Sequence, residues 1–160
     1  MATNLKNLSD FNTENVIAKG LKIAIVVAEW NEHITFALRD GAVQTLVQMG
    51  AQMEDIKIDY VPGAYELPMG AKIVARYHPD AIITIGCVIQ GETPHFDYIC
   101  QATSIGVMNV GLETHIPVIF GVLTTNNEQE ALDRCGGKHG NKGDEAAFTA
   151  VKMALLNKKY

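Results

Sequence analysis

The chain has 160 residues, 48% of them hydrophobic, which predicts one folded domain with a full core. Its formal net charge of -5 argues against a nucleic-acid partner, because such proteins usually present a basic face. No apolar run approaches the ~20 residues that span a bilayer, so we expect no membrane association. The polar N-terminus lacks the apolar stretch of a secretory signal, and we expect a cytoplasmic location.

Cysteine usage is uninformative about catalysis. Cys87, Cys100 and Cys135 are widely spaced and form neither a CxxC pair nor a metal-binding pattern. An odd number of cysteines in a cytosolic chain is typical of free thiols, so we predict no disulfide and no metal site.

The first half of the chain predicts two strands around a helix. Residues 22–28 (KIAIVVA) form a short apolar run that indicates a buried strand. Asn31 is a candidate N-cap, apolar residues at helical spacing follow over 34–49, and Gly50 ends the helix. Residues 56–61 (IKIDYV) predict a second strand.

The second half repeats this alternation. A helix is predicted over 66–77, a strand over 81–89, a long helix over 94–112 and a strand over 117–124. Asn126 then precedes Gln129 at the spacing of a capping box, which predicts a further helix. A last helix is expected from about 143 to 157, after a Gly-rich link.

Apolar strands that alternate with helices predict an α/β fold. We expect a flavodoxin-like, three-layer αβα sandwich around a four-stranded parallel sheet with right-handed crossovers. Residues 21–160 then form a single domain, and residues 1–20 are an N-terminal extension. Within this extension, Val16, Ile17 and Ala18 fit either a short strand or a tail.

The loops after the four strands are the place to look for a ligand site, because ligands of open α/β sheets bind beyond the carboxyl ends of the strands. These loops cover residues 28–31, 62–66, 90–95 and 124–127. They bring an aromatic residue, an acid and a histidine to one edge of the predicted sheet.

The third of these loops has the features of an anion site. Thr93 can cap the following helix, Pro94 suits its first position, and free N–H groups at a helix start attract phosphate. Gly91 allows the backbone to approach a ligand closely. His95 is either a general acid/base beside that anion or a histidine packed at the helix start.

Other residues have both a structural and a functional interpretation. Trp30 either packs in the core or stacks on a planar heterocycle. Glu66 either complements a helix dipole or binds a ligand hydroxyl or ring N–H. Arg134 either complements the end of a helix or binds phosphate through its planar fork of donors. Residues 138–143 form a basic turn that suits solvent, an anion or a subunit contact.

Common motif classes are absent from the sequence. It has no GxGxxG after the first strand, no GxxxxGK[ST] and no GxSxG. The first loop also lacks the phosphate cradle of flavodoxins and the acidic pair of response-regulator receivers.

Four ordered segments carry a specific resemblance. They are VPGAYELP at 61–68, GCVIQGETPHFDY at 86–98, PVIFGVLTT at 117–125 and GNKG at 140–143. Together they resemble the 6,7-dimethyl-8-ribityllumazine synthase family over nearly all of residues 20–157. The resemblance implies a transferase of riboflavin biosynthesis that condenses 5-amino-6-(D-ribitylamino)uracil with 3,4-dihydroxy-2-butanone 4-phosphate and releases phosphate and water. It implies no metal and no organic cofactor.

The resemblance also assigns the site residues. His95 would be the catalytic, proton-transfer residue, and Trp30 would stack on the pyrimidine. The other pyrimidine and ribityl positions are Ala64, Tyr65, Glu66, Cys87, Val88, Ile89 and Phe120. The phosphate positions are Glu92, Thr93, Arg134 and Lys142. Phe120 and Arg134 would come from a neighbouring subunit.

Three positions depart from the commonest pattern of the family. Many relatives have Phe in place of Trp30, a small neutral residue in place of Glu92 and Arg in place of Gln90. A carboxylate repels phosphate, so we expect the Glu92 side chain to point away and its backbone N–H to bind. We expect the same reaction despite these three changes, whereas the substrate affinities do not follow from the resemblance.

The resemblance further implies a homo-oligomer. A site shared between subunits requires the pentamer of the family, and the short link at 136–143 favours the form in which twelve pentamers build a sixty-subunit icosahedral shell. Residues 1–20 would then extend along the neighbour's sheet by strand addition. An association with riboflavin synthase is also expected.

Two other classes of function stay open at this stage. One is a flavin or lumazine binder without catalysis, against which the intact His95 and Arg134 argue. The other is a purely structural shell protein, which would not need the loops of a ligand site.

Overall fold

The computed structural model describes residues 7–13 and 16–160. Its main strands are β1 (Ile23–Ala28), β2 (Ile56–Val61), β3 (Ala81–Ile89) and β4 (Val118–Thr125), and a small hairpin pairs β5 (Cys135–Gly137) with β6 (Gly140–Asn141). The α-helices are α1 (Glu32–Gln48), α2 (Leu67–Val74), α3 (His95–Thr114), α4 (Glu128–Leu132) and α5 (Lys142–Lys159). Short 3-10 helices are η1 (Met53–Asp55), η2 (Ala64–Glu66) and η3 (Ala75–Tyr77).

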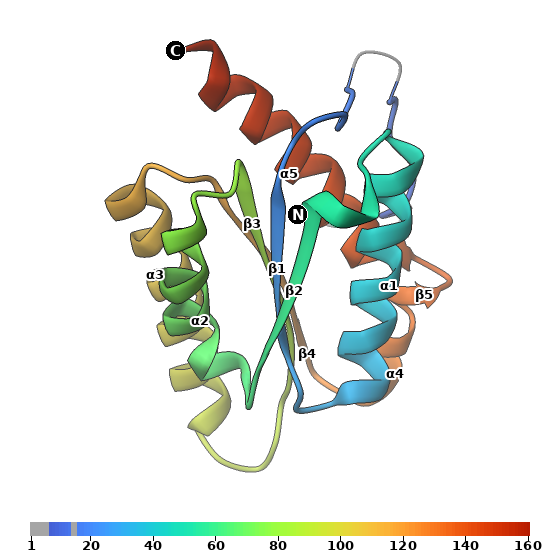
Figure 1. Cartoon of the computed structure of the whole chain (residues 1–160). Coiled ribbons are helices and arrows are strands. Elements are labelled where there is room, and N and C mark those ends of the chain that lie inside the picture. Colours follow the sequence, from blue (N-terminus) through green and yellow to red (C-terminus); the bar gives the residue numbers. More distant parts are fainter. Residues whose placement is uncertain (1–6, 14–15) are drawn as a thin grey trace.

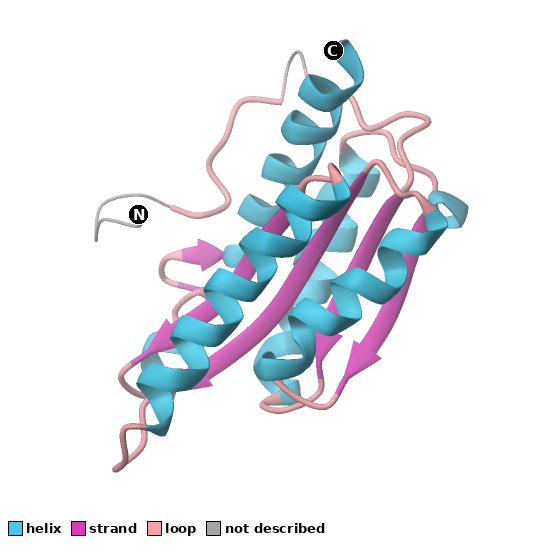
Figure 2. Cartoon of the chain, turned by 90° about the vertical axis from the view of Figure 1, so that its left-hand side faces the viewer, coloured by secondary structure: helices cyan, strands magenta, loops and turns pink. Residues whose placement is uncertain are grey.

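The main sheet is parallel throughout and has the strand order β2-β1-β3-β4. Helices α2 and α3 cover one face, and α1, α4 and α5 cover the other (Figures 1 and 2). The predicted three-layer, flavodoxin-like fold with a four-stranded parallel sheet is therefore confirmed. The apolar strands are explained by this cover, because a parallel sheet buried on both faces needs apolar residues on both.

Two apolar cores follow from the alternation of side chains along each strand. In β1, Ile23, Ile25 and Val27 point towards α1 and α5, whereas Ala24 and Val26 point towards α2. All six residues of β1 are buried. The central strands are therefore fixed from both sides, and their carboxyl ends form a rigid edge for the loops.

Helices α1 and α5 pack closely against each other. A Cβ atom built on Gly143 would lie 1.8 Å from the backbone oxygen of Leu38. Only glycine permits this approach between the start of α5 and the middle of α1. The contact fixes the position of α5 and of the hairpin before it.

The helix starts differ in detail from those predicted. The cap of α4 is Asn127 rather than Asn126, and its side-chain oxygen accepts a 2.9 Å hydrogen bond from the backbone N–H of Glu130. Glu130 in turn accepts from the backbone N–H of Asn126, the residue before the cap, so the cap itself lies one residue later than predicted and the return bond goes to its predecessor. The N-cap of α3 is Pro94, so the predicted cap at Thr93 is wrong.

The hairpin of β5 and β6 replaces the predicted Gly-rich link. The hairpin continues directly into α5. Its last residue, Asn141, is the N-cap of this helix and accepts a hydrogen bond from the backbone N–H of Gly143. The backbone N–H of Lys142 donates to the carbonyl of Arg134 at 2.8 Å. This hydrogen bond across the base of the hairpin holds the backbones of Arg134 and Lys142 side by side.

The N-terminal segment from residue 7 to residue 13 packs against the β5–β6 hairpin and helix α5 of the same chain. The Leu8 N–H donates to the carbonyl of His139 at 2.7 Å, and the Phe11 ring stacks on Phe148 with centroids 4.6 Å apart. Residues 16–18 form no strand within this chain, and Ala18 is buried in its core. The remainder of the predicted extension, residues 1–6 and 14–15, lies outside the described residues. No helix in the described part of the chain is long and apolar enough to cross a membrane.

Candidate functional site

A cleft of about 680 Å³ lies beyond the carboxyl ends of β1, β2 and β3. Its lining contains His95 and all the predicted pyrimidine and ribityl positions except Phe120. The lining residues are Trp30, Asn31, Gly63, Ala64, Tyr65, Glu66, Cys87, Val88, Ile89, His95 and Ile99. Three loops that are far apart in the sequence are therefore brought to one site, at the carboxyl edge of the sheet, where a ligand was expected.

The loops of the cleft are tied to one another by their backbones. The Glu29 N–H donates to the carbonyl of Val61 at 2.8 Å, and the Trp30 N–H donates to the carbonyl of Pro62 at 3.1 Å. From the other side, the buried hydroxyl of Thr103 on α3 donates to the carbonyl of Ala64 at 3.1 Å. The turn that starts α2 is thus held between β1 and α3.

Strand β3 extends past its neighbour β1. The pairing of the two strands ends at Val27 and Ile85, whereas β3 continues to Ile89. The N–H groups of Ile82 and Gln90 donate to carbonyls on the β4 side. Backbone groups alternate in direction along a strand, so those of Ile89 point to the opposite side, where β1 has ended. They offer the cleft one main-chain donor and one main-chain acceptor.

Two large aromatic side chains stand at the rim of the cleft. Trp30 is 74% exposed and Tyr65 is 60% exposed. The packing interpretation of Trp30 is therefore wrong. An indole fixed by its backbone and open to solvent on its faces can stack on a planar ring.

Glu66 lies in the turn between β2 and α2. Its backbone N–H donates to the carbonyl of Gly63 at 3.2 Å. Its carboxylate folds back over the turn, because a Cβ atom built on Gly63 would lie 3.2 Å from the Oε2 atom of Glu66. A side chain at position 63 would therefore press on this carboxylate and change where it points.

His95 is the first residue of α3 and is exposed to the cleft. The unpaired N–H groups of this 20-residue helix begin at the same point, next to the imidazole. Glu92 and Thr93 are exposed in the loop before the helix, and neither lines the cleft. The histidine thus stands between the cleft and a helix start that suits an anion.

Cys87 has no reactive thiol. Its side chain is 3% exposed, and burial raises the pKa of the thiol to about 12, with smaller contributions from Cys135 and Glu128. The thiol is therefore protonated at neutral pH and is no nucleophile. In residues 7–13 and 16–160, no three His, Cys, Asp or Glu side chains gather closely enough to hold a metal ion.

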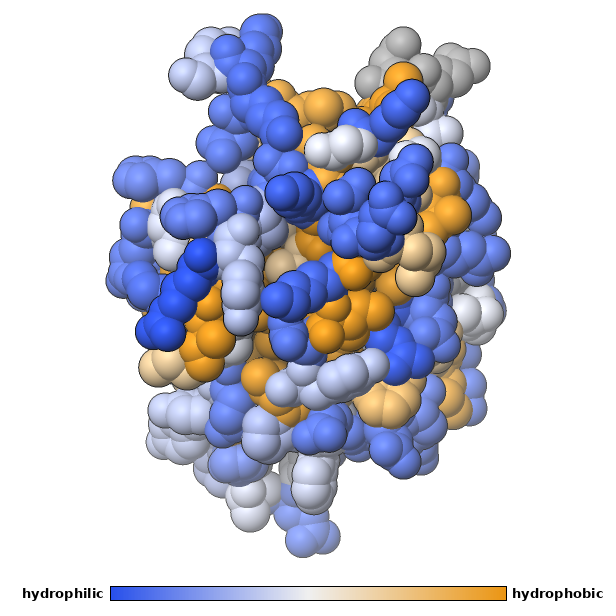
Figure 3. Space-filling model, in the orientation of Figure 1, coloured by the Kyte–Doolittle hydropathy of each residue, from blue (hydrophilic) through white to orange (hydrophobic). Residues whose placement is uncertain are grey.

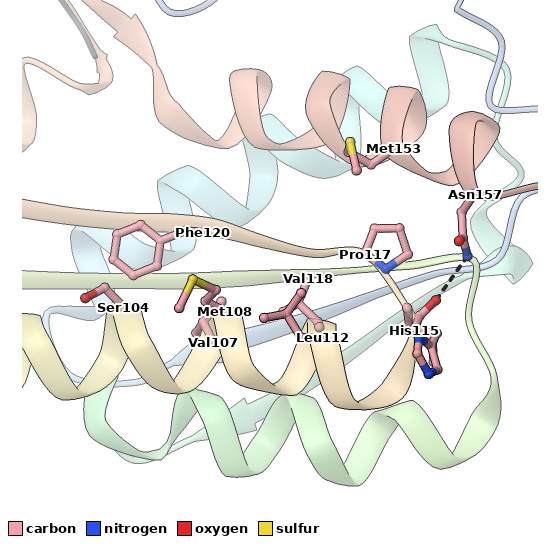
Figure 4. Close-up of a pocket in the computed structure, with 12 residues that line it drawn as sticks. Ser104, Val107, Met108, Leu112, His115, Pro117, Val118, Phe120, Met153 and Asn157 are labelled. Carbon is pink, nitrogen blue, oxygen red and sulfur yellow. Dashed lines mark hydrogen bonds between the residues drawn. The ribbon is translucent and has the colours of Figure 1, made fainter.

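Besides Glu92 and Thr93, three further predicted residues lie outside the cleft of their own chain: Phe120, Arg134 and Lys142. Phe120 faces a groove of about 450 Å³ between α3, β4 and α5, together with Met108, Leu112 and Met153 (Figure 4). Lys142 borders a separate cavity of about 270 Å³ on the other side of Phe120.

The cations of this region bind within their own chain. Lys142 pairs with Glu145, at 3.0 Å between Nζ and Oε2. Arg134 lies just beyond α4, and its Nη1 atom donates to the carbonyl of Glu130 at 2.8 Å. This is the helix-end interaction that was one of the two alternatives for Arg134.

Three lining residues were not predicted as site residues. Asn31 was predicted only as a helix cap, and Gly63 only as part of a turn. Ile99 lies one helical turn after His95 on α3, and this spacing is the signal that could have placed it in the cleft.

Comparison with known proteins gives a consistent result. Residues 20–158 match the family model of 6,7-dimethyl-8-ribityllumazine synthase. The chain is 50% identical over 160 residues to the 6,7-dimethyl-8-ribityllumazine synthase of Porphyromonas gingivalis, with 99% of each chain covered. It is 54% identical over 149 residues to that of Cytophaga hutchinsonii, covering 92% of this chain and 94% of the relative. The protein of the same name from Phocaeicola vulgatus is 47% identical over 161 residues, with 99% and 96% coverage.

Proposed function

Because the chain belongs to the 6,7-dimethyl-8-ribityllumazine synthase family, we propose that the cleft at the carboxyl edge of the sheet is its active site. The enzyme is a transferase of riboflavin biosynthesis. It condenses 5-amino-6-(D-ribitylamino)uracil with 3,4-dihydroxy-2-butanone 4-phosphate and releases phosphate and water. The observation that supports this site most strongly is the meeting of Trp30, Glu66, the end of β3 and His95 around one cavity.

The pyrimidine substrate fits the cleft by its chemistry. The ring stacks on Trp30 at the rim, and its polar edge meets the main-chain donor and acceptor of Ile89 beyond the end of β1. The ribityl chain then runs along Ala64 and Tyr65 to the Glu66 carboxylate, which accepts hydrogen bonds from its hydroxyls. Cys87 and Val88 complete the wall behind the ring.

His95 acts as the proton-transfer group. The amine of the pyrimidine attacks the ketone to give an imine, phosphate leaves, the ring closes and water is lost. Holding two substrates together supplies about 7–11 kcal/mol of the barrier reduction by proximity. Proton transfer by a positioned histidine adds about 10²–10⁴-fold. The enzyme needs neither a metal nor an organic cofactor for these steps.

The phosphate is bound at the start of α3 and by cations from a second subunit. The backbone N–H groups at Glu92 and Thr93 lie before the helix start, and the Glu92 side chain is exposed there. Arg134 and Lys142 lie outside the cleft of their own chain, and we assign them to the cleft of the neighbour. Phe120, which lines the groove of Figure 4, is assigned to the neighbour's cleft together with these two cations.

A shared site requires an oligomer. The cleft and the groove around Phe120 are different surfaces of one chain, and a contact between them is head-to-tail, which closes into a ring. In the groove, Met108 is 57% and Leu112 is 68% exposed, and a subunit contact would cover them. We propose the pentamer as this ring, and a shell of twelve pentamers that associates with riboflavin synthase in the cytoplasm.

The N-terminal extension is proposed to take part in this assembly. Among the described residues, β2 pairs with β1 alone, which leaves its outer edge open to a further strand. The view onto this edge shows apolar residues gathered between the two helical layers (Figure 3). The extension of a neighbour would cover them by strand addition.

The proposed function is tested by absorbance at the lumazine band after both substrates are mixed with the purified protein. A protein-free blank is essential, because the condensation also proceeds without catalysis. We expect a rate well above the blank and a rate for His95→Ala that is about 10²–10⁴-fold lower in its catalysed part but still above the blank. A rate equal to the blank would favour the binder or the structural shell instead.

The shared site is tested by mixing inactive subunits. His95→Ala and Arg134→Ala chains are each measured alone, then co-refolded and measured again. In a mixed ring some clefts combine an intact His95 with an intact Arg134, so activity returns. Activity that stays at the level of the separate variants would show that both residues serve one chain's own cleft.

A further inference from the structure

Asn31 has a backbone conformation that is unusual for the start of a helix. It lies between β1 and α1 with φ 61° and ψ 46°, in the left-handed region. In the described residues, the only other non-glycine residues with positive φ are His78 and His115, and both follow the end of a helix. Left-handed residues are common at helix ends, whereas a residue that caps a helix start is normally extended.

The side chain of Asn31 does not cap its helix either. Instead, its Nδ2 atom donates to the carbonyl of Cys87 at 3.1 Å. This carbonyl lies on β3 just past Ile85, where the pairing with β1 ends. The amide of Asn31 therefore takes the place of the next β1 residue and closes the gap between the two strands.

The backbone on both sides of Trp30 is held by this arrangement. On one side, the Trp30 N–H donates to the carbonyl of Pro62. On the other, the Asn31 carbonyl accepts from the N–H groups of Ile34 and Thr35 at 2.9 and 3.0 Å. The indole itself is 74% exposed and little supported by packing. The direction of the indole therefore depends on the backbone, and the left-handed conformation of Asn31 determines the course of the backbone directly after Trp30.

The bond to Cys87 also affects how the cleft recognises a ring. Because the Asn31 amide donates to it, the Cys87 carbonyl is satisfied and needs no hydrogen bond from a ligand, whereas the main-chain groups of Ile89 lie beyond the end of the pairing with β1. Without the amide, the Cys87 carbonyl would need another donor and would compete with Ile89 for the pyrimidine edge.

We propose that Asn31 is a positioning residue: its left-handed backbone aims Trp30, and its amide occupies the Cys87 carbonyl so that the pyrimidine pairs with Ile89. This inference rests on the proposed function of the cleft. Asn31 acts through Trp30 and through the end of β3.

Three substitutions separate the two roles. Asn31→Gly keeps the left-handed conformation at no steric cost but removes the amide. Asn31→Ala removes the amide and also disfavours the conformation. Asn31→Asp tolerates the conformation but places a carboxylate against the Cys87 carbonyl. His78→Ala is the matched control, because His78 has φ 51° and is exposed at the end of η3, away from the cleft lining.

The readouts are steady-state kinetics and tryptophan fluorescence. Trp30 is the only tryptophan of the chain, so the emission reports this position alone. Quenching by 5-amino-6-(D-ribitylamino)uracil gives the affinity for the pyrimidine, and KM is measured separately for each substrate. We expect Asn31→Ala to shift the emission and to raise the KM for the pyrimidine about tenfold, from the cost of a left-handed alanine. The KM for the keto-phosphate should stay unchanged.

The pattern of rescue decides the outcome. Asn31→Gly should restore the emission of the wild type but keep part of the rise in KM, and Asn31→Asp should raise KM at least as much as Asn31→Gly. If Asn31→Ala behaves like His78→Ala in emission and in both KM values, the positioning role is refuted while the proposed function stands. If the wild type neither exceeds the blank nor shows quenching, the proposed function itself fails, and the inference with it.

Discussion

Thr103→Val tests whether α3 holds in place the turn that we propose to bind the ribityl chain. Thr103 is fully buried, and its hydroxyl donates to the carbonyl of Ala64 at 3.1 Å. Valine has nearly the same shape, so the substitution removes this hydrogen bond and little else. The Ala64 carbonyl keeps a second partner, the backbone N–H of Leu67.

The expected magnitude follows from that remaining partner. Because the carbonyl is not left without a donor, the loss is that of one neutral hydrogen bond, about 1 kcal/mol. For a chain of this size, we expect Tm to fall by about 2–4 °C. The turn that carries Ala64, Tyr65 and Glu66 becomes looser, so the KM for the pyrimidine should rise by up to about fivefold.

Thr84→Val is the matched control. Thr84 is also fully buried, and its hydroxyl donates to the carbonyl of Ile119 at 2.8 Å, in the middle of the sheet. The assay compares thermal unfolding and the KM for each substrate in both variants. We expect similar losses of Tm, with the KM for the pyrimidine changed only by Thr103→Val. An equal rise of this KM in both variants, or in neither, would refute the reasoning.

The remaining predictions concern close packing and thiol chemistry. Gly143→Ala places a methyl group against the backbone of Leu38 and should destabilise the chain by about 1–3 kcal/mol in thermal unfolding. Gly111→Ala, whose nearest contact would be an ordinary 3.5 Å, is the control and should be neutral or stabilising by up to about 1 kcal/mol. In native protein at pH 8, iodoacetamide should modify Cys87 much more slowly than Cys100, because burial raises the pKa of Cys87 to about 12 and the side chain is 3% exposed. Equal rates in the native state, read by peptide mass spectrometry, would contradict this. Because the folded chain keeps this thiol protonated, its contribution to stability should be lost as the pH rises above its ordinary pKa of 9.0.

Elements with strong local patterns were predicted closely. The bounds of β2 and β3 agree with the prediction, because each is an apolar or β-branched run that ends at a clear breaker or loop. A parallel sheet places the loops after its strands at one edge, and the cleft lies at that edge. The hairpin of β5 and β6 was missed because its strands have three and two residues. Such short strands have no periodicity, and contacts with the rest of the chain hold them in place.

Asn31 is the N-cap of α1, as its residue type predicted, but its backbone is left-handed and its amide binds the Cys87 carbonyl in place of capping the helix. That carbonyl has no partner on β1 because the pairing of the two strands ends at Ile85, which only the folded sheet reveals. The resemblance to the family already implied that Phe120 and Arg134 lie outside the cleft of their own chain, and the lining of the cleft agrees with this. A single sequence gives the type of a residue but not which distant group is left for it to bind.

The extension of β3 past β1 has a consequence for inhibitor design. At Ile89 the cleft offers main-chain atoms, which nearly every substitution retains, and only proline would remove the N–H. A compound that draws its affinity from this pair of groups would leave the enzyme few single-residue routes to resistance at that contact. A compound that depends on the Trp30 ring would not have this advantage, because one codon change can replace the ring. Because β3 is longer than β1, the cleft has main-chain groups that single substitutions rarely remove, beside a Trp30 side chain that a single substitution can replace.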